Sequence, residues 1–126
     1  MTSILKPKVY MKSTCPFCFK FLLFLSEAGL LEQFEIISAD GNDDAEMDKY
    51  REFLQEETGQ AASFPTVEIA PGEYLADSDV LIDYFAAKHE IDKTSLQTLA
   101  YYLQGPFKAQ ISLFKENRAL KEQLGS

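Results

Sequence analysis

The chain has 126 residues, the size of one domain, and is long enough to bury a core without disulfide staples. It carries 12 Lys and Arg against 20 Asp and Glu, a net charge of -8. This acidity argues against nucleic acid and anionic membranes as partners, because both recruit basic surfaces. The first residues lack the apolar segment of a secretory signal, and the longest apolar run, Phe21 to Leu25, is too short to span a bilayer. We therefore expect a cytoplasmic protein whose two cysteines are kept reduced.

Hydrophobic periodicity predicts the order β-α-β-α-β-β-α over residues 1–92. Strands are predicted at Val9–Met11, Phe34–Ile37, Thr66–Ala70 and Glu73–Leu75. Helices are predicted from Pro16 to Gly29, from Ala45 to Glu57 and from Asp77 or Ser78 to about His89. We expect the first β-α-β unit to be parallel with a right-handed crossover, and the last two strands to form an antiparallel hairpin.

The remaining segment, residues 93–126, has a helical pattern that is interrupted at Gly105-Pro106. No linker or repeat separates it from the first part, so we expect a helical extension packed on the domain of residues 1–92. Apolar residues recur in it at helical spacing: Leu96, Leu99, Ala100, Leu103, Phe107, Ile111 and Phe114. Such a stripe is either packed within the chain or paired with a second copy. We favour packing within a monomer, and a homodimer remains the alternative.

Cys15 and Cys18 form a Cys-x-x-Cys pair that follows a strand and opens a helix. Pro16 suits the first helical position, which places Cys15 at the N-cap, where free backbone N–H groups and the helix dipole stabilise a thiolate. The pKa of a free thiol is about 8.5, and at such positions it falls to roughly 3.5–7.5. Lys12 adds a nearby positive charge. The pattern predicts Cys15 as the reactive thiol and Cys18, one turn later, as the resolving thiol.

Two other roles for the cysteine pair are weaker. The cysteines could simply fill a core, or they could be half of a zinc site. Zinc needs two further ligands, but the chain has no third cysteine and a single histidine, His89, near a helix end. We therefore expect no metal, and we assign the pair to redox chemistry, for which this placement is a specific signal.

Pro65 precedes the predicted hairpin, where the thioredoxin fold places a cis-proline beside its reactive cysteine. Together with the cysteine pair, this proline gives a resemblance to the glutaredoxin family, running from about Lys8 to His89. The matching segments are Lys12-Ser13-Thr14-Cys15-Pro16-Phe17-Cys18, Arg51-Glu52-Phe53-Leu54 with Thr58-Gly59, Ser63-Phe64-Pro65 and Asp77-Ser78-Asp79. Asp77-Ser78 and residues 81–85 also resemble the N-terminal domain of glutathione transferases. The expected fold is α/β: a thioredoxin/glutaredoxin fold with a four-stranded mixed sheet flanked by helices and a C-terminal helical extension.

The resemblance implies glutathione as a co-substrate. The residues implied to contact it are Lys12, Phe17, Arg51, Phe64, Pro65, Asp77, Ser78 and Asp79. Lys12 and Arg51 would bind the glycyl carboxylate, and the backbone of Phe64 would pair with the cysteinyl part. The acidic and serine residues would take the γ-glutamyl end, together with a helix N-terminus. The same charges also suit solvated positions or helix caps, an alternative that the sequence leaves open.

The predicted function is a glutathione-dependent thiol–disulfide oxidoreductase that reduces protein disulfides or glutathione mixed disulfides through Cys15 and Cys18. One alternative is a glutathione transferase-like enzyme, although the helical tail is far shorter than a transferase's second domain. Another is an iron–sulfur cluster bridged between two copies, with Cys15 and glutathione as ligands.

Overall fold

A computed structural model describes residues 6–125, and the side chains of residues 6–120. Its sheet has four strands in the order β2-β1-β3-β4. The strands are β1 (Lys8–Lys12), β2 (Glu35–Ala39), β3 (Thr66–Ala70) and β4 (Glu73–Ala76). β1 pairs with β2 in parallel, whereas β1 with β3 and β3 with β4 are antiparallel. The mixed sheet, the parallel first unit and the hairpin are therefore confirmed.

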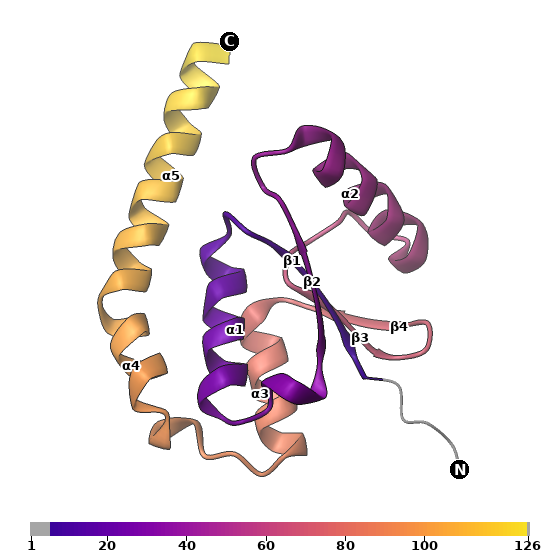
Figure 1. The fold of residues 1–126 in the computed structure, drawn as a ribbon. Helices are drawn as coiled ribbons and strands as arrows, with labels where there is room; N and C mark the ends of the chain where they lie inside the picture. The colour runs from indigo at the N-terminus through magenta and orange to yellow at the C-terminus, as the bar shows by residue number, and fades with distance from the viewer. Residues whose placement is uncertain (1–5, 126) are drawn as a thin grey trace.

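Helices cover both faces of this sheet (Figure 1). The α-helices of the described residues are α1 (Pro16–Glu27), α2 (Asp44–Thr58), α3 (Ser78–Lys88), α4 (Gln97–Gln104) and α5 (Pro106–Gly125). α1 and α3 lie side by side on one face, α2 lies on the other, and α4 and α5 run along the outer side of α1. No helix among these residues is both long and apolar enough to cross a membrane.

The second strand lies slightly later in the chain than the sequence predicts. A short 3₁₀ segment, Leu31–Gln33, leads into Phe34, which is buried in the core rather than paired in the sheet. Its ring meets Phe85 of α3 edge-on, with centroids 4.9 Å apart. The strand therefore begins at Glu35, because the Phe34 side chain packs against α3.

The core lies between the sheet, α1 and α3. Phe21, Phe24 and Leu25 of α1 are fully buried, as are Val9 and Val67 of the strands below them. Each large apolar side chain buried in this way contributes roughly 1.5–3 kcal/mol. α1 is apolar on nearly all sides because it is enclosed between the sheet and α4, and this enclosure holds its N-terminal turn at the end of β1.

The C-terminal extension divides into a packed part and a partly exposed part. In α4, Leu99 and Tyr102 are buried against α1. The two carboxylate oxygens of Glu27, at the end of α1, accept hydrogen bonds of 2.8 Å from the backbone N–H groups of Thr98 and Leu99, and so cap α4. In α5 the apolar stripe is only half covered, and Phe114 is 37% exposed. The helix extends past the end of α1 (Figure 1).

Candidate active site at the start of α1

Cys15 is the N-cap residue of α1, as the sequence predicts. Its backbone is extended, Pro16 takes the first helical position, and the carbonyl of Cys15 accepts a 3.1 Å hydrogen bond from the N–H of Phe19. The sulfur therefore lies at the positive end of the helix dipole. It is partly exposed, whereas Cys18, one turn further on, is buried. Both cysteines are free thiols.

The pKa values of the two thiols are shifted in opposite directions. The Cys18 thiol donates to Cys15 and lowers the pKa of Cys15 to about 6, against the opposing effect of burial. The backbone N–H groups of Cys18 and Phe17 and the charge of Lys12 act in the same direction. The pKa of Cys18 is raised by the same hydrogen bond and by burial. Its sulfur also accepts a 3.4 Å hydrogen bond from the backbone N–H of Lys12. Cys15 is therefore a thiolate at neutral pH, and Cys18 remains a thiol.

The Phe64–Pro65 peptide bond is cis and lies beside the sulfur of Cys15. Cys15 Sγ is 3.8 Å from the carbonyl oxygen of Phe64. This is the arrangement expected for Pro65 from the sequence. The loop before β3 thus brings a backbone edge to Cys15, although its residues lie far away along the chain.

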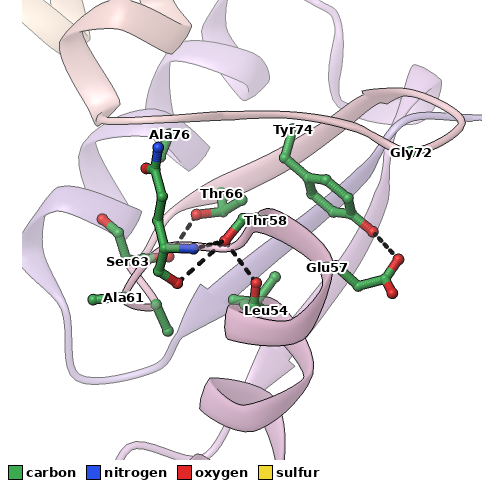
Figure 2. Close-up of a pocket in the computed structure, with 11 residues that line it drawn as sticks. Leu54, Glu57, Thr58, Ala61, Ser63, Thr66, Gly72, Tyr74 and Ala76 are labelled. Atoms are coloured by element: carbon green, nitrogen blue, oxygen red, sulfur yellow. Dashed lines mark hydrogen bonds between the residues drawn. The ribbon is translucent and has the colours of Figure 1, made fainter.

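Hydroxyl groups surround a cavity of about 220 Å³ that is lined by the end of α2, the segment before Phe64 and the β3–β4 hairpin (Figure 2). Thr66 Oγ1 donates to the carbonyl of Ser63 at 2.6 Å, and Thr58 Oγ1 donates to the carbonyl of Leu54 at 2.7 Å. The Tyr74 hydroxyl donates to Glu57 at 3.2 Å. These three hydroxyls all have partners within the protein, and that of Thr66 holds the loop at Ser63.

The predicted γ-glutamyl residues lie at the start of α3. Asp77 is the N-cap, with a positive φ of 82°, and its carboxylate accepts from the backbone N–H groups of Asp79 (2.9 Å) and Val80 (3.3 Å). Ser78 is buried. The carboxylate of Asp79 is ion-paired with Lys20 of α1 at 2.7 Å. Asp77 therefore caps α3, and Asp79 links α3 to α1.

Phe17 and Arg51, the remaining predicted glutathione contacts, lie in different surroundings. Phe17 is partly exposed next to Cys15, and its ring meets Phe107 of α5 edge-on at 5.7 Å. Arg51 is on the exposed side of α2 and pairs with Asp48 at 3.5 Å. Among the described residues, no hydrogen bond or ion pair links Arg51 to the other predicted contacts.

Sequence reasoning missed two contributors to this site. Lys20 is only 4% exposed, and its ammonium lies 4.7 Å from the ring centroid of Phe107 and 5.7 Å from that of Phe17. A lone lysine within an otherwise apolar helix was the available signal. The Tyr102 hydroxyl of α4 donates to Oε1 of Gln110 and lies 3.5 Å from the carbonyl oxygen of Pro16; the pKa of Tyr102 is raised by burial and by the charge of Cys15. Nothing in the sequence pattern pointed to this contact.

Residues 9–94 match the family described as glutathione S-transferase, N-terminal domain. The chain belongs to this family. The match covers more than half of the chain and includes every predicted site residue. It confirms the resemblance to the N-terminal domain of glutathione transferases. No curated protein sequence gives a significant match.

Solved structures with the same fold are also glutathione transferases by their descriptions. Glutathione transferase Omega 3C from Trametes versicolor superimposes with a TM-score of 0.52 at 14% identity, over 70% of this chain and 35% of that one. A possible glutathione S-transferase from Rhodopseudomonas palustris gives 0.54 at 20% identity, over 66% and 40%. A glutathione transferase homolog from Sulfitobacter, with bound glutathione, gives 0.54 at 16% identity, over 81% and 50%.

These similarities establish the thioredoxin-type fold of the family member described here. The matched region spans between about a third and a half of the length of these transferases. Among the described residues, no group of three or more His, Cys, Asp or Glu side chains is arranged to hold a metal ion.

Proposed function

We propose that the protein is a glutathione-dependent thiol–disulfide oxidoreductase. The observation that carries this proposal is the cysteine pair, in which a partly exposed Cys15 has a pKa of about 6 and a buried Cys18 thiol lies next to it. A thiolate at neutral pH is the nucleophile of disulfide exchange, and a neighbouring thiol can resolve the product. A reducing compartment such as the cytoplasm would supply the glutathione.

In the first step, the Cys15 thiolate attacks the glutathione sulfur of a mixed disulfide. A bond forms between Cys15 Sγ and that sulfur, the old S–S bond breaks, and the other half leaves as a thiolate that takes a proton from water. The protein's contribution is to keep Cys15 ionised and accessible beside the carbonyl of Phe64.

Two routes complete the cycle. A second glutathione can attack the mixed disulfide, which releases glutathione disulfide and restores the Cys15 thiolate. Alternatively, Cys18 loses its proton and attacks Cys15, which expels glutathione and leaves a Cys15–Cys18 disulfide that two glutathiones then reduce. The buried position and raised pKa of Cys18 favour the first route for small substrates, because a protonated thiol is a poor nucleophile.

Glutathione would lie across the start of α1, the Phe64–Pro65 loop and the start of α3. Lys12 would bind its glycyl carboxylate, and the backbone edge at Phe64 would pair with its cysteinyl part. At the γ-glutamyl end, the exposed carboxylate of Asp79 would bind the ammonium group. The N-terminus of α3 would bind the carboxylate, for which Asp77 would need to release the backbone N–H groups of Asp79 and Val80. Phe17 and Pro65 would border the sulfur, and Arg51 would need to leave Asp48 to reach the carboxylate.

The test is reduction of a glutathione mixed disulfide, coupled to glutathione reductase. We expect turnover by the wild type, none by Cys15→Ser, and retained turnover of the small substrate by Cys18→Ser. Cys18→Ser should be impaired with protein disulfides, which need intramolecular resolution. Turnover by Cys15→Ser equal to that of the wild type would contradict the proposal.

The family match favours one second candidate, conjugation of glutathione to an electrophile. A transferase activates the thiol of glutathione itself, so conjugation should survive Cys15→Ser, whereas disulfide reduction should not. A generic electrophile assayed beside the mixed disulfide separates the two activities. Visible absorbance after anaerobic purification would instead indicate the cluster-bridging alternative.

A further inference from the structure

A second cleft opens beside Cys15, between the loops that follow β1 and β2 and the projecting part of α5. It measures about 420 Å³ and is lined by Lys12, Thr14, Asn42, Phe114, Asn117 and Arg118. Thr14 directly precedes Cys15 in the chain. The cleft is therefore lined by the residue that precedes Cys15, and α5 supplies one of its walls.

The floor of this cleft is fixed in shape. The backbone N–H of Gly41 donates to Ser13 Oγ at 3.0 Å, and the N–H of Ser13 donates to the carbonyl of Ala39 at 2.9 Å. Gly41 packs so closely that a Cβ atom there would lie 2.1 Å from Thr14 Oγ1. The two loops therefore form one unit at the end of the sheet, and glycine is required where they meet.

Two cations line the cleft without a carboxylate partner in the part of the chain that the structure describes. The ion pairs there involve other residues, at Lys20–Asp79, Arg51–Asp48 and Lys93–Asp83. Two acidic residues flank the cleft residues in the β2–α2 loop, Asp40 and Asp43, and neither lines the cleft. Their carboxylates accept hydrogen bonds from the backbone N–H groups of Asn42 (2.9 Å) and Glu46 (3.2 Å), respectively. In a chain of net charge -8, two unpaired cations and two amides around one cleft form an anion-binding arrangement.

We propose that Arg118 binds a carboxylate on the half of the disulfide substrate that leaves as a thiol, while Lys12 binds the glycyl carboxylate of glutathione. The inference rests on the proposed function and names its substrate class: mixed disulfides whose departing half is anionic. A substrate whose glutathione half lies along Phe64 can extend its other half across Thr14 into this cleft. Arg118 is then a specificity-determining residue, and Phe114, 37% exposed, offers an apolar contact to the carbon chain.

Kinetic discrimination between two substrates tests the proposal. The probes are the mixed disulfides of glutathione with 3-mercaptopropionate, which is anionic, and with 2-mercaptoethanol, which is neutral. We expect the wild type to favour the anionic probe in kcat/KM, and Arg118→Gln to lower the anionic-to-neutral ratio about two- to five-fold, the strength of one partly exposed ion pair. High salt should lower the wild-type ratio in the same way.

Lys115→Gln is the matched control. It removes one positive charge from the same helix, but Lys115 faces a different hollow, with Phe107 and Ile111. We expect it to leave the ratio unchanged. If Arg118→Gln raises KM equally for both probes, Arg118 binds the carboxylate of glutathione itself, and the proposal is overturned. An unchanged ratio in Arg118→Gln would overturn it as well.

A glutathione-free measurement separates failure of this proposal from failure of the proposed function. Iodoacetate and iodoacetamide both alkylate the same Cys15 thiolate and release iodide, so the ratio of their rates is independent of the thiolate fraction. In full-length protein carrying Cys18→Ser, Arg118→Gln should lower the iodoacetate-to-iodoacetamide ratio about two- to five-fold, and Lys115→Gln should not. If neither mixed disulfide is turned over but this ratio falls, the proposed function fails while the anion site stands. If the ratio is unchanged, the anion site fails.

Discussion

Replacing Cys18 by Ala removes the thiol that makes the largest contribution to the acidity of Cys15. At pH 7 a thiol with a pKa of about 6 is roughly 90% ionised, whereas one with the ordinary value of 9.0 is only about 1% ionised. The backbone N–H groups at the start of α1 and the charge of Lys12 remain in the variant. We expect the pKa of Cys15 to rise by at least about one unit, without a full return to 9.0.

The assay is ultraviolet thiolate absorbance against pH, with the rate of iodoacetamide alkylation as a second readout. Cys18→Ser is the matched control, because its hydroxyl can still donate to the thiolate. Its pKa for Cys15 should lie between those of the wild type and Cys18→Ala. If Cys18→Ala titrates within about half a unit of the wild type, the helix N-terminus and Lys12 account for the acidity, and the assignment to Cys18 is refuted.

The same shift makes stability depend on pH. The folded-state pKa of Cys15 is lowered, so the ionised thiol stabilises the reduced fold fully above the unfolded-state value of about 9, and this contribution is lost as the pH falls through about 6. The melting temperature of the reduced protein should carry a component that rises across this window. In Cys18→Ala the folded-state pKa of Cys15 is higher, so the pH range over which stability rises should begin at a higher pH than in the wild type.

Three further perturbations test the packing around the site. Leu99→Ala should cost about 2–5 kcal/mol in denaturant unfolding because Leu99 is 4% exposed, whereas Leu113→Ala, at a 59% exposed position, should stay within about 0.5 kcal/mol. Glu27→Gln should weaken the cap of α4. Because that hydrogen bonding lowers the pKa of Glu27, the wild type should lose the stabilisation as the pH falls below the ordinary value of 4.5, and the variant should lack this dependence in thermal melts. Lys20→Met should be nearly neutral, within about 1 kcal/mol, because it leaves only a solvated carboxylate, whereas Asp79→Asn strands a buried ammonium and should cost more. Equal losses of stability in the two leucine variants would contradict the burial of Leu99, and equal losses in Lys20→Met and Asp79→Asn would contradict the burial of Lys20.

The order of strands and helices was predictable because each element carries its own period of apolar residues. The position of Cys15 was predictable because proline is favoured at a first helical position and poorly tolerated within a helix. Both features depend on local chemistry, so they can be derived from a short stretch of sequence. The boundaries of the helices and strands differ from the predicted ones by one or two residues. For β2 the reason is that the Phe34 side chain packs in the core, so the strand begins one residue later.

The features that the sequence did not predict depend on contacts between distant segments. Lys20 is buried because Asp79 and two aromatic rings surround its ammonium, and those partners come from α3, α1 and α5. The cleft that contains Arg118 exists because α5 passes the loops after β1 and β2. A helical stripe indicates which face is apolar, but it does not indicate how far a neighbouring element extends along that face. For this reason the covered stripe in α4 and the half-covered stripe in α5 look alike in the sequence.

Helix α1 links Cys15 to the C-terminal extension. Its first turn positions Cys15, while Phe19 meets the ring of Tyr102 edge-on at 5.0 Å, and the hydroxyl of that tyrosine lies 3.5 Å from the carbonyl oxygen of Pro16. The pKa of Tyr102 is raised in part by the charge of Cys15, so the two groups are also coupled electrostatically. Because the backbone of this turn supplies the N–H groups that stabilise the thiolate, a contact that fixes the turn also fixes the acidity of Cys15. The extension therefore acts on the site in two places, through Tyr102 on the helix turn and through α5 on the cleft beside it.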